Sequence, residues 1–379
     1  MRKMLRNSDP FGELMPRHIY NVVLICSEYD QFLIEADGRV EEELFREYTQ
    51  LGLTNPPKIS FARTREDLFY LLKTTEADLV ITMMELGETN VIELAQSIKM
   101  QYPTLPVVAL SPSPTHHVSI ALKKRNIAAI DYLYYWQGNS NIFLAMIKLI
   151  EDKMNALHDA QTEAEVPVII LVENSVRFYS TYLPLLYKAI IQQTRMSMSE
   201  DLTPWGAALR MRGRPKIVLA QNYEEAIALY DAFNKNVLGI ITDVNFDKEG
   251  KSDSEAGLKL CQFIRSKEPD LPLLLQSTNA DYKDDADSVS ASFIWKLSSS
   301  LLNDLKLYLF ENYGFGPFIF RHHESGNEIA RAETLRELQH TLETIPIESF
   351  VNHASRNDFS RWLKARSLYV LANLFRPYR

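Results

Sequence analysis

Leu238-Gly239-Ile240-Ile241-Thr242-Asp243-Val244-Asn245 is an apolar run that ends abruptly in one carboxylate. A short apolar run bounded by polar residues is typical of a strand buried on both faces, as in a parallel sheet. In open α/β sheets, ligands bind beyond the carboxyl ends of the strands. Asp243 therefore stands where a site would form, although capping of the next loop explains this stretch equally well.

The composition narrows the class of protein. The chain has 379 residues, which suits two or three domains, and its apolar content of 46% is sufficient for buried cores. The net charge of -8 argues against a general binder of nucleic acid or membrane surfaces. Cys26 and Cys261 lie far apart in apolar runs, which favours buried thiols in a reducing compartment. No apolar run approaches the ~18 residues of a membrane span and no signal peptide is evident, so we expect a cytoplasmic protein.

Short apolar runs alternate with helical patterns twice along the chain. Strands are predicted over residues 21–26, 58–61, 79–83, 107–110 and 129–134, and again over 168–172, 216–220, the Asp243 run, 271–276 and 292–295. Helices are predicted over 28–52, from 65, over 89–101, 115–125 and 139–160, and again over 176–198, from 223, over 254–267 and 298–312, with a weak helix over 279–291. This alternation predicts an α/β protein with two flavodoxin-like (βα)5 doubly wound parallel sheets in tandem.

The expected domain organisation follows from these patterns. It comprises an N-terminal tail (1–17), a first α/β domain (18–160), a second (166–312) and a small α+β C-terminal unit (313–379). Residues 196–214 form an insertion without clear periodicity. In the C-terminal unit we expect a hairpin around Ser325-Gly326 and helices over 334–344, 357–366 and 367–375.

The two α/β halves are an internal repeat. Residues 105–111 match 271–277, and Ile81-Thr82-Met83 matches Ile241-Thr242-Asp243. The apolar frameworks agree, whereas the polar residues at the strand ends differ. The two halves are therefore expected to share a fold and to differ in chemistry.

In the second half, four strand ends carry side chains suited to phosphoryl chemistry: Glu173 and Asn174, Asp243, Ser277 and Lys296. Flavodoxin-like strand order brings these ends to one edge of the sheet. Oxygen ligands from two adjacent strands suit Mg²⁺, while a hydroxyl and an ammonium suit a phosphoryl group. Asn174 carries no charge, so a weakened Mg²⁺ site is expected.

These motifs resemble the receiver domains of two-component response regulators over about residues 166–312. The resemblance implies that Asp243 is phosphorylated by a histidine kinase or a small phosphodonor, with Ser277 and Lys296 holding the phosphoryl group. It implies an Mg²⁺ site formed by Glu173, Asn174, Asp243 and the backbone carbonyl of Asn245. It also implies that Phe293 rotates with the signal.

The first half resembles a receiver that has lost its chemistry. Met83 stands at the phosphoacceptor position and Tyr135 at the lysine position, so a docking role in cis or in a homodimer is expected. The tandem arrangement, the insertion and residues 349–366 resemble regions found ahead of bacterial phosphoenolpyruvate-synthase-like kinase domains. No catalytic residue of such a kinase is present, so the chain is not expected to be an enzyme. A non-phosphorylated scaffold and a regulatory region of such an enzyme remain alternatives.

The C-terminal unit carries two further signals. His353 with Asp358 and Ser360 includes residue types found in hydrolases, but a packed or capping histidine is expected. Several basic residues favour a solvated face or interdomain docking rather than DNA binding, because no helix-turn-helix pattern is clear. They are Arg361, Lys364, Arg366, Arg376 and Arg379.

Overall fold

The computed structural model describes residues 11–35, 40–87, 89–112, 129–136, 138, 140–196 and 204–376. The helix predicted over 115–125 lies outside these residues. The chain divides into two compact units, each holding one sheet. Pro16–Met154 and Ser175–Tyr187 form one unit; Asn155–Asn174 and Lys188–Arg379, with the segment up to Met15, form the other.

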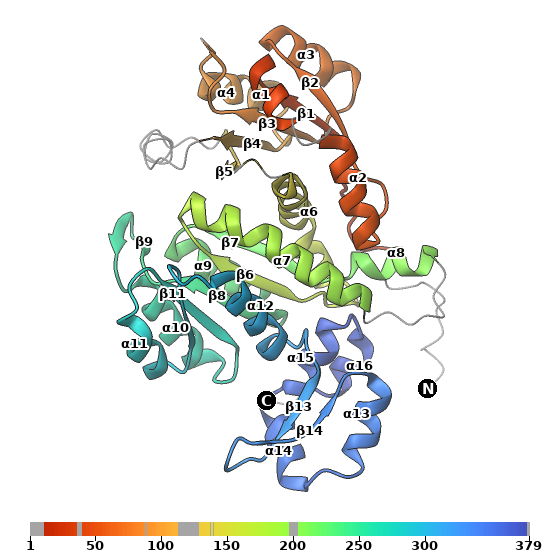
Figure 1. The fold of residues 1–379 in the computed structure, drawn as a ribbon, viewed down its shortest axis with the longest axis vertical. Coiled ribbons are helices and arrows are strands. Elements are labelled where there is room, and N and C mark those ends of the chain that lie inside the picture. Colours follow the sequence, from red (N-terminus) through yellow and green to blue (C-terminus); the bar gives the residue numbers. More distant parts are fainter. Residues whose placement is uncertain are drawn as a thin grey trace. The chain divides into compact units, whose positions relative to one another are not determined.

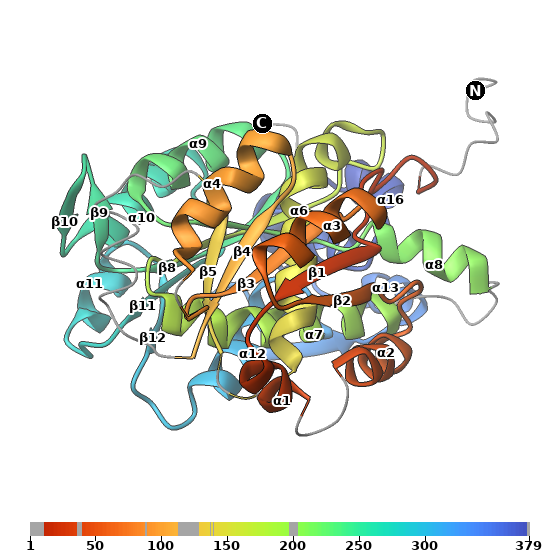
Figure 2. The same ribbon diagram turned by 90° about the horizontal axis from the view of Figure 1, so that it is seen from above.

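The first sheet has five parallel strands in the order β2-β1-β3-β4-β5, which lie side by side in Figure 2. The strands are β1 (Asn21–Ile25), β2 (Lys58–Ala62), β3 (Leu79–Met83), β4 (Val107–Ser111) and β5 (Tyr132–Tyr135). Its helices include α1 (Glu28–Ile34), α2 (Val40–Leu51), α3 (Arg65–Thr74), α4 (Val91–Gln101) and the start of α6 (Asn141–Gln161). Thr64 and Asp67 form a capping box that fixes where α3 begins.

The second sheet repeats this topology, with the strand order β12-β11-β8-β6-β7. Its strands are β6 (Val168–Val172), β7 (Lys216–Ala220), β8 (Val237–Asp243), β11 (Leu273–Ser277) and β12 (Ser292–Trp295). Helices α9 (Tyr223–Phe233), α10 (Ala256–Lys267), α11 (Tyr282–Ser288) and α12 (Leu301–Asn312) belong to the same unit (Figure 1). Helix α7 (Val176–Met196) follows β6, and its residues up to Tyr187 belong to the unit of the first sheet. Read from its other edge, the order is 2-1-3-4-5, so the predicted flavodoxin-like class is confirmed for both sheets.

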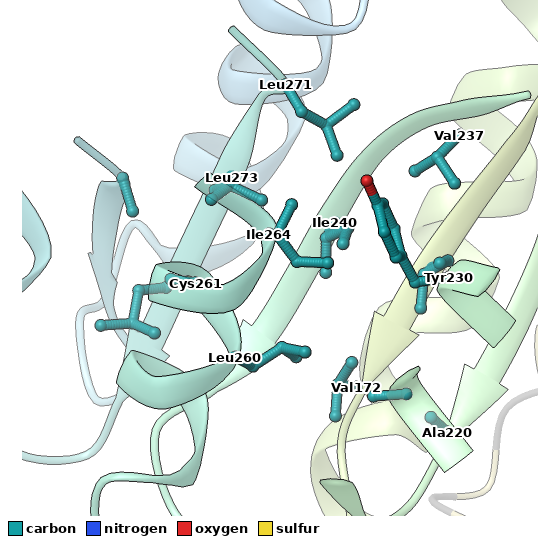
Figure 3. Close-up of a cluster of buried hydrophobic side chains, with 14 of the residues drawn as sticks. Val172, Ala220, Tyr230, Val237, Ile240, Leu260, Cys261, Ile264, Leu271 and Leu273 are labelled. Atoms are coloured by element: carbon teal, nitrogen blue, oxygen red, sulfur yellow. The ribbon is translucent and has the colours of Figure 1, made fainter. Parts of the chain in front are cut away.

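The main core of the second sheet lies between its strands and helices α9 and α10. Ile240 of β8 and Leu273 of β11 face Leu260 and Ile264 of α10, and Tyr230 of α9 closes one end (Figure 3). Continuous apolar strands with both faces covered are what a parallel doubly wound sheet requires. Cys261 lies in this core, where burial raises the pKa of its thiol to about 12. Cys26 is also a buried free thiol, as predicted.

The sequence patterns missed some short elements. Helix α8 (Pro204–Arg212) lies in the insertion that showed no clear periodicity. Strands β9 (Phe246–Lys248) and β10 (Lys251–Asp253) form an antiparallel hairpin directly after Asp243. Its turn, Glu249-Gly250, has positive φ at both residues (52° and 73°), as a two-residue hairpin turn requires. The glycine at the second turn position is the signal that the sequence carried.

The C-terminal segment belongs to the same compact unit as the second sheet. It holds a hairpin of β13 (Phe318–Arg321) and β14 (Glu328–Ala332), then α13 (Leu335–Leu342), α14 (Ile347–Ser355), α15 (Asp358–Ala365) and α16 (Tyr369–Leu374). The hairpin and three helices match the prediction, and α14 was missed.

His353 is a packed histidine, as expected. Its Nδ1 lies 2.7 Å from Asp358 Oδ2, and its Nε2 accepts a hydrogen bond from the backbone N–H of Arg321 at 3.0 Å. Both ring nitrogens are therefore occupied by structural contacts. Ser360 Oγ is buried and has no hydrogen-bond partner among the described residues, so the three side chains do not form a triad.

None of the helices in the described ranges combines the length and the apolar character that a transmembrane segment needs.

Gly239 makes the closest approach between β8 and the C-terminal segment. A Cβ at this position would lie 2.1 Å from Cε1 of the buried Tyr313 ring. We therefore expect Gly239→Ala to lower the free energy of unfolding by about 1–3 kcal/mol through overpacking. Urea denaturation of wild type, Gly239→Ala, Tyr313→Leu and the double variant would measure this effect. The cost of Gly239→Ala should shrink in the Tyr313→Leu background, and an equal cost in both backgrounds would contradict the proposed clash.

Candidate functional site

Polar side chains meet at the carboxyl edge of the second sheet. Asp243 ends the central strand β8, and Glu173 follows the neighbouring strand β6. On the other side of β8, Ser277 ends β11, and Lys296 follows the edge strand β12. The parallel register pairs Gln276 with Asp243, which places these strand ends level with one another.

Lys296 connects two of the strand ends through ion pairs. Its Nζ lies 2.5 Å from Glu173 Oε2 and 2.9 Å from Asp243 Oδ1. The side chains of Glu173 and Lys296 are almost fully buried, whereas that of Asp243 is 12% exposed. One ammonium therefore contacts two carboxylates, and of these only the Asp243 carboxylate is open to solvent.

The protonation of Lys296 reflects this environment. Burial alone would lower the pKa of the ammonium, but the charges of Glu173 and Asp243 outweigh it and hold the pKa above its usual value. Lys296 is therefore a permanent cation at physiological pH. A buried cation of this kind persists only because its acceptors are close and hydrogen bonded.

The backbone around Asp243 is held by helix α10. The N–H of Gly257 donates to the carbonyl of Val244 at 2.9 Å, and the N–H of Val244 donates to Asp243 Oδ1 at 2.8 Å. A Cβ at position 257 would lie 2.0 Å from the carbonyl oxygen of Asp243. Glycine is therefore required where α10 approaches the end of β8, a constraint that the sequence analysis missed because it depends on a contact between distant residues.

Ser277 lies on the strand beside Asp243. Its carbonyl accepts a hydrogen bond from the N–H of Lys296 at 2.8 Å, and its hydroxyl accepts one from the N–H of Asn279 at 3.1 Å. These contacts fix the backbone on which both the hydroxyl and the ammonium are carried. They leave the Ser277 hydroxyl proton available as a donor.

The remaining predicted site residues lie around this centre. Asn174 is half-buried directly after Glu173, and Phe293 is half-buried on β12 against the core. The side chain of Asn245 is exposed and accepts a hydrogen bond from Ser252 of the β9–β10 hairpin at 3.1 Å. The structure thus joins Glu173, Asp243 and Lys296 directly, while Asn174, Asn245 and Phe293 flank them.

The oxygen donors at this edge are of the type that Mg²⁺ prefers. Glu173 and Asp243 supply carboxylates and Asn174 a neutral amide, a set that is compatible with a magnesium ion that keeps several waters. Over the part of the chain that the structure describes, no three His, Cys, Asp or Glu side chains are grouped so that they could hold a metal ion. A metal here would depend on fewer charges than a fully acidic site provides, and it would compete with Lys296 for Glu173 Oε2 and Asp243 Oδ1.

The equivalent edge of the first sheet has different chemistry. Strand β3 ends in the buried Met83, and β5 ends in Tyr135. Cys26 follows β1, where burial and then Asp30 raise the pKa of its thiol to about 12. Ser27 is used as the N-cap of α1, accepting from the N–H of Asp30 at 3.0 Å. The central strand of this sheet therefore presents no carboxylate at its end.

Trp295 lies beside the site, and its fluorescence can be used to follow changes there. Its indole N–H donates to the carbonyl of Thr278 at 2.9 Å, and its side chain is 42% exposed. It immediately precedes Lys296, so its fluorescence is placed to respond to events at the carboxyl edge of the sheet.

Comparison with known proteins gives only distant structural likenesses. Neither a protein-family model nor a curated protein matches this chain. The chain is similar to the signal receiver domain of an HD domain-containing protein from Pseudomonas fluorescens Pf-5, with 21% identity over 38% of this chain and 98% of that domain, and a TM-score of 0.25. A two-component system response regulator/GGDEF domain protein gives 12% identity over 76% and 98% of the two chains, with a TM-score of 0.32. NtrX from Brucella abortus in complex with ADP gives 11% identity over 92% and 74%, with a TM-score of 0.29. The fold assignment depends on the strand order of the two sheets rather than on these scores.

Replacing Lys296 tests whether one ammonium stabilises both carboxylates. In Lys296→Met the buried Glu173 loses its cation, so we expect the free energy of unfolding at neutral pH to fall by about 3–5 kcal/mol. An unpaired buried carboxyl has a raised pKa and takes up a proton more readily in the folded state than in the unfolded state. The deficit relative to wild type should therefore shrink as the pH is lowered from neutral.

Urea denaturation across this pH range would measure the effect of Lys296→Met. Adding Glu173→Gln to Lys296→Met should recover part of the loss, and the exposed Lys306→Met serves as the matched control. A deficit that is independent of pH, or one as large in Lys306→Met, would show that the two carboxylates do not depend on Lys296.

Proposed function

We propose that this chain is a response-regulator-like signalling protein in which Asp243 accepts a phosphoryl group. The observation that carries the proposal is the position of the Asp243 carboxylate. It ends the central strand of the sheet, is partly open to solvent, and lies 2.9 Å from a buried ammonium. In this fold, that edge is where ligands bind.

The phosphoryl transfer would proceed by in-line displacement. An oxygen of Asp243 forms a bond to phosphorus while the bond from phosphorus to the donor breaks, and the donor leaves with the electron pair. Lys296 supplies a fixed positive charge beside the incoming group, and the Ser277 hydroxyl is positioned on the neighbouring strand as a hydrogen-bond donor. A histidine kinase or a small phosphodonor would provide the phosphoryl group.

Magnesium would supply further positive charge for the transferred group. Glu173, Asn174, Asp243 and the backbone carbonyl of Asn245 are the candidate ligands. Because Asn174 is neutral, we expect weaker Mg²⁺ binding than at a site with a second carboxylate there.

The modification would change the balance of charge at Lys296. A phosphoryl group adds roughly 1.5 to 2 negative charges at neutral pH. Lys296 would then be attracted to the phosphoryl oxygens as well as to Glu173. The side chains at the strand ends would therefore adopt a second arrangement. Phe293, half-buried on β12, is the residue we expect to move with this change.

The first sheet would serve as a docking domain, in cis or in a homodimer, because Met83 cannot accept a phosphoryl group. In a second candidate function the whole chain is a non-phosphorylated scaffold. The observation that favours it is the double ion pair of Lys296, which already gives both Glu173 and Asp243 a cationic partner from the protein itself. A role as the regulatory region of a phosphoenolpyruvate-synthase-like kinase, in cis or in trans, is a further proposal that the resemblance of residues 349–366 motivates.

A titration with Mg²⁺ and beryllofluoride, a phosphoryl mimic, tests the proposed role of Asp243. Wild type should show a saturable change in tryptophan fluorescence that requires both components, because Trp295 adjoins Lys296. Asp243→Asn should abolish the change, since the amide cannot replace the charged acceptor. Asp284→Asn, which removes an exposed carboxylate from α11, is the matched control and should respond as wild type does.

Two outcomes would contradict the assignment. The same response in Asp243→Asn as in wild type would place the binding elsewhere. No response in wild type at millimolar Mg²⁺, with the Asp284→Asn control folded, would favour the scaffold and would indicate that Asn174 has disabled the metal site.

A further inference from the structure

A polar pocket lies at the opposite end of the second sheet from Asp243. It has a volume of about 420 Å³ and is bordered by Val237 and Leu238, where β8 begins, and by Leu271, which precedes β11. The C-terminal segment closes its other side with residues of α15 and Arg376. All of these residues belong to one compact unit.

The pocket collects positive charge in a chain whose net charge is negative. Its basic lining residues are Lys235, Lys267, Arg361, Lys364 and Arg376, and its acidic ones are Glu268 and Asp270. Glu268 already accepts a hydrogen bond from the hydroxyl of Tyr230 at 3.1 Å. Arg361 is already paired with Asp358, whose Oδ1 lies 3.2 Å from its Nη1. The other basic residues still outnumber the two acidic lining residues, and such an excess of positive charge attracts a small anion.

Lys364 is the innermost of these cations. Its side chain is 8% exposed, and its ion-pair partner among the described residues is Glu165, whose Oε2 is 3.9 Å from Nζ. Arg376 approaches the same oxygen at 3.9 Å. Both distances are longer than a hydrogen bond, so the charge of this nearly buried ammonium is only loosely balanced.

Two buried acceptor atoms at this site have unsatisfied hydrogen-bonding capacity. Glu165 Oε2, which lies 3.9 Å from the ammonium, and Asn357 Oδ1, which belongs to the pocket lining, are buried without a hydrogen-bond partner among the described residues. Buried polar groups are normally paired with protein, water or a ligand. Both atoms accept hydrogen bonds, so they call for a hydroxyl or amine donor on an occupant, whereas an anionic group would bind the cations.

We propose that this pocket binds a small phosphate-bearing molecule, with Lys364 at its centre and Arg376 at its rim. Phosphate oxygens accept hydrogen bonds from the planar guanidinium of arginine and attract the point charge of lysine. Because the lining comes both from the second sheet and from the C-terminal segment, an occupant bridges the two and stabilises their contact.

The charge of Lys364 gives the site a dependence on pH. Burial, followed by the nearby charge of Arg376, lowers the pKa of the ammonium to about 8, while Glu165 and Glu268 act in the opposite direction. Arg361, Lys235, Lys267, Tyr230 and Asp270 also border the pocket. Anion binding should therefore weaken as the pH rises past about 8.

Isothermal titration calorimetry of the full chain with pyrophosphate tests the proposal. We expect saturable binding in the millimolar range or tighter, and a loss of about tenfold in affinity in Lys364→Gln, where one charge-assisted contact is removed. Arg376→Gln, at a half-buried position, is the second variant and should also weaken binding. Lys283→Gln removes an exposed lysine from α11 and should leave the affinity unchanged. Asp243→Asn should also leave it unchanged, which separates this pocket from the carboxyl edge of the sheet.

The same titration with sulfate, whose charge is constant above neutral pH, tests the role of the ammonium. Binding to wild type should weaken as the pH passes about 8, and Lys364→Gln should show no such step. The proposal is overturned if wild type gives no binding at millimolar pyrophosphate. It is also overturned if Lys283→Gln weakens binding as much as Lys364→Gln does, because the attraction would then come from general surface charge.

Discussion

The ammonium of Lys296, held between the carboxylates of Glu173 and Asp243, is the interaction on which the candidate site depends. The three side chains come from three different strands, and only a parallel sheet with β8 between β6 and β11 brings those strand ends to one edge. Removing two carboxylates and an ammonium from water costs several kcal/mol for each ion. This cost is offset only when the ions are close together, so the exact strand register matters to the chemistry as well as to the fold.

The two sheets share one fold but differ in the chemistry of their strand ends. Both have the flavodoxin-like strand order, and in both the central strand is fully buried up to its last residue. That last residue is Asp243 in one sheet and Met83 in the other. Packing constrains the strand interior in both cases, whereas the strand end carries a buried methionine in one sheet and a partly exposed aspartate in the other.

The C-terminal segment connects to the second sheet at specific backbone positions. The ring of Tyr313 packs on Gly239, four residues before Asp243 on the same strand, and Arg361 Nη2 donates to the carbonyl of Asp270 at 2.9 Å. Asp243 and the contact of Gly239 with Tyr313 therefore lie on one strand. The basic pocket around Lys364 lies at this same junction, which places both proposed ligands on opposite ends of one strand.

The sequence by itself determined the alternation of strands and helices, the two-fold repeat, the burial of both cysteines and the residues at each strand end. These features depend on local periodicity and on the rule that parallel strands end at one edge. The sequence analysis missed α8, whose apolar periodicity is weak, and also α14 and the glycine contacts at positions 239 and 257. Tertiary structure alone decided that Lys296 reaches both Glu173 and Asp243, and that Lys364 is nearly buried beside Glu165. Such contacts join residues 53 to 199 positions apart, and only the packed chain sets their distances.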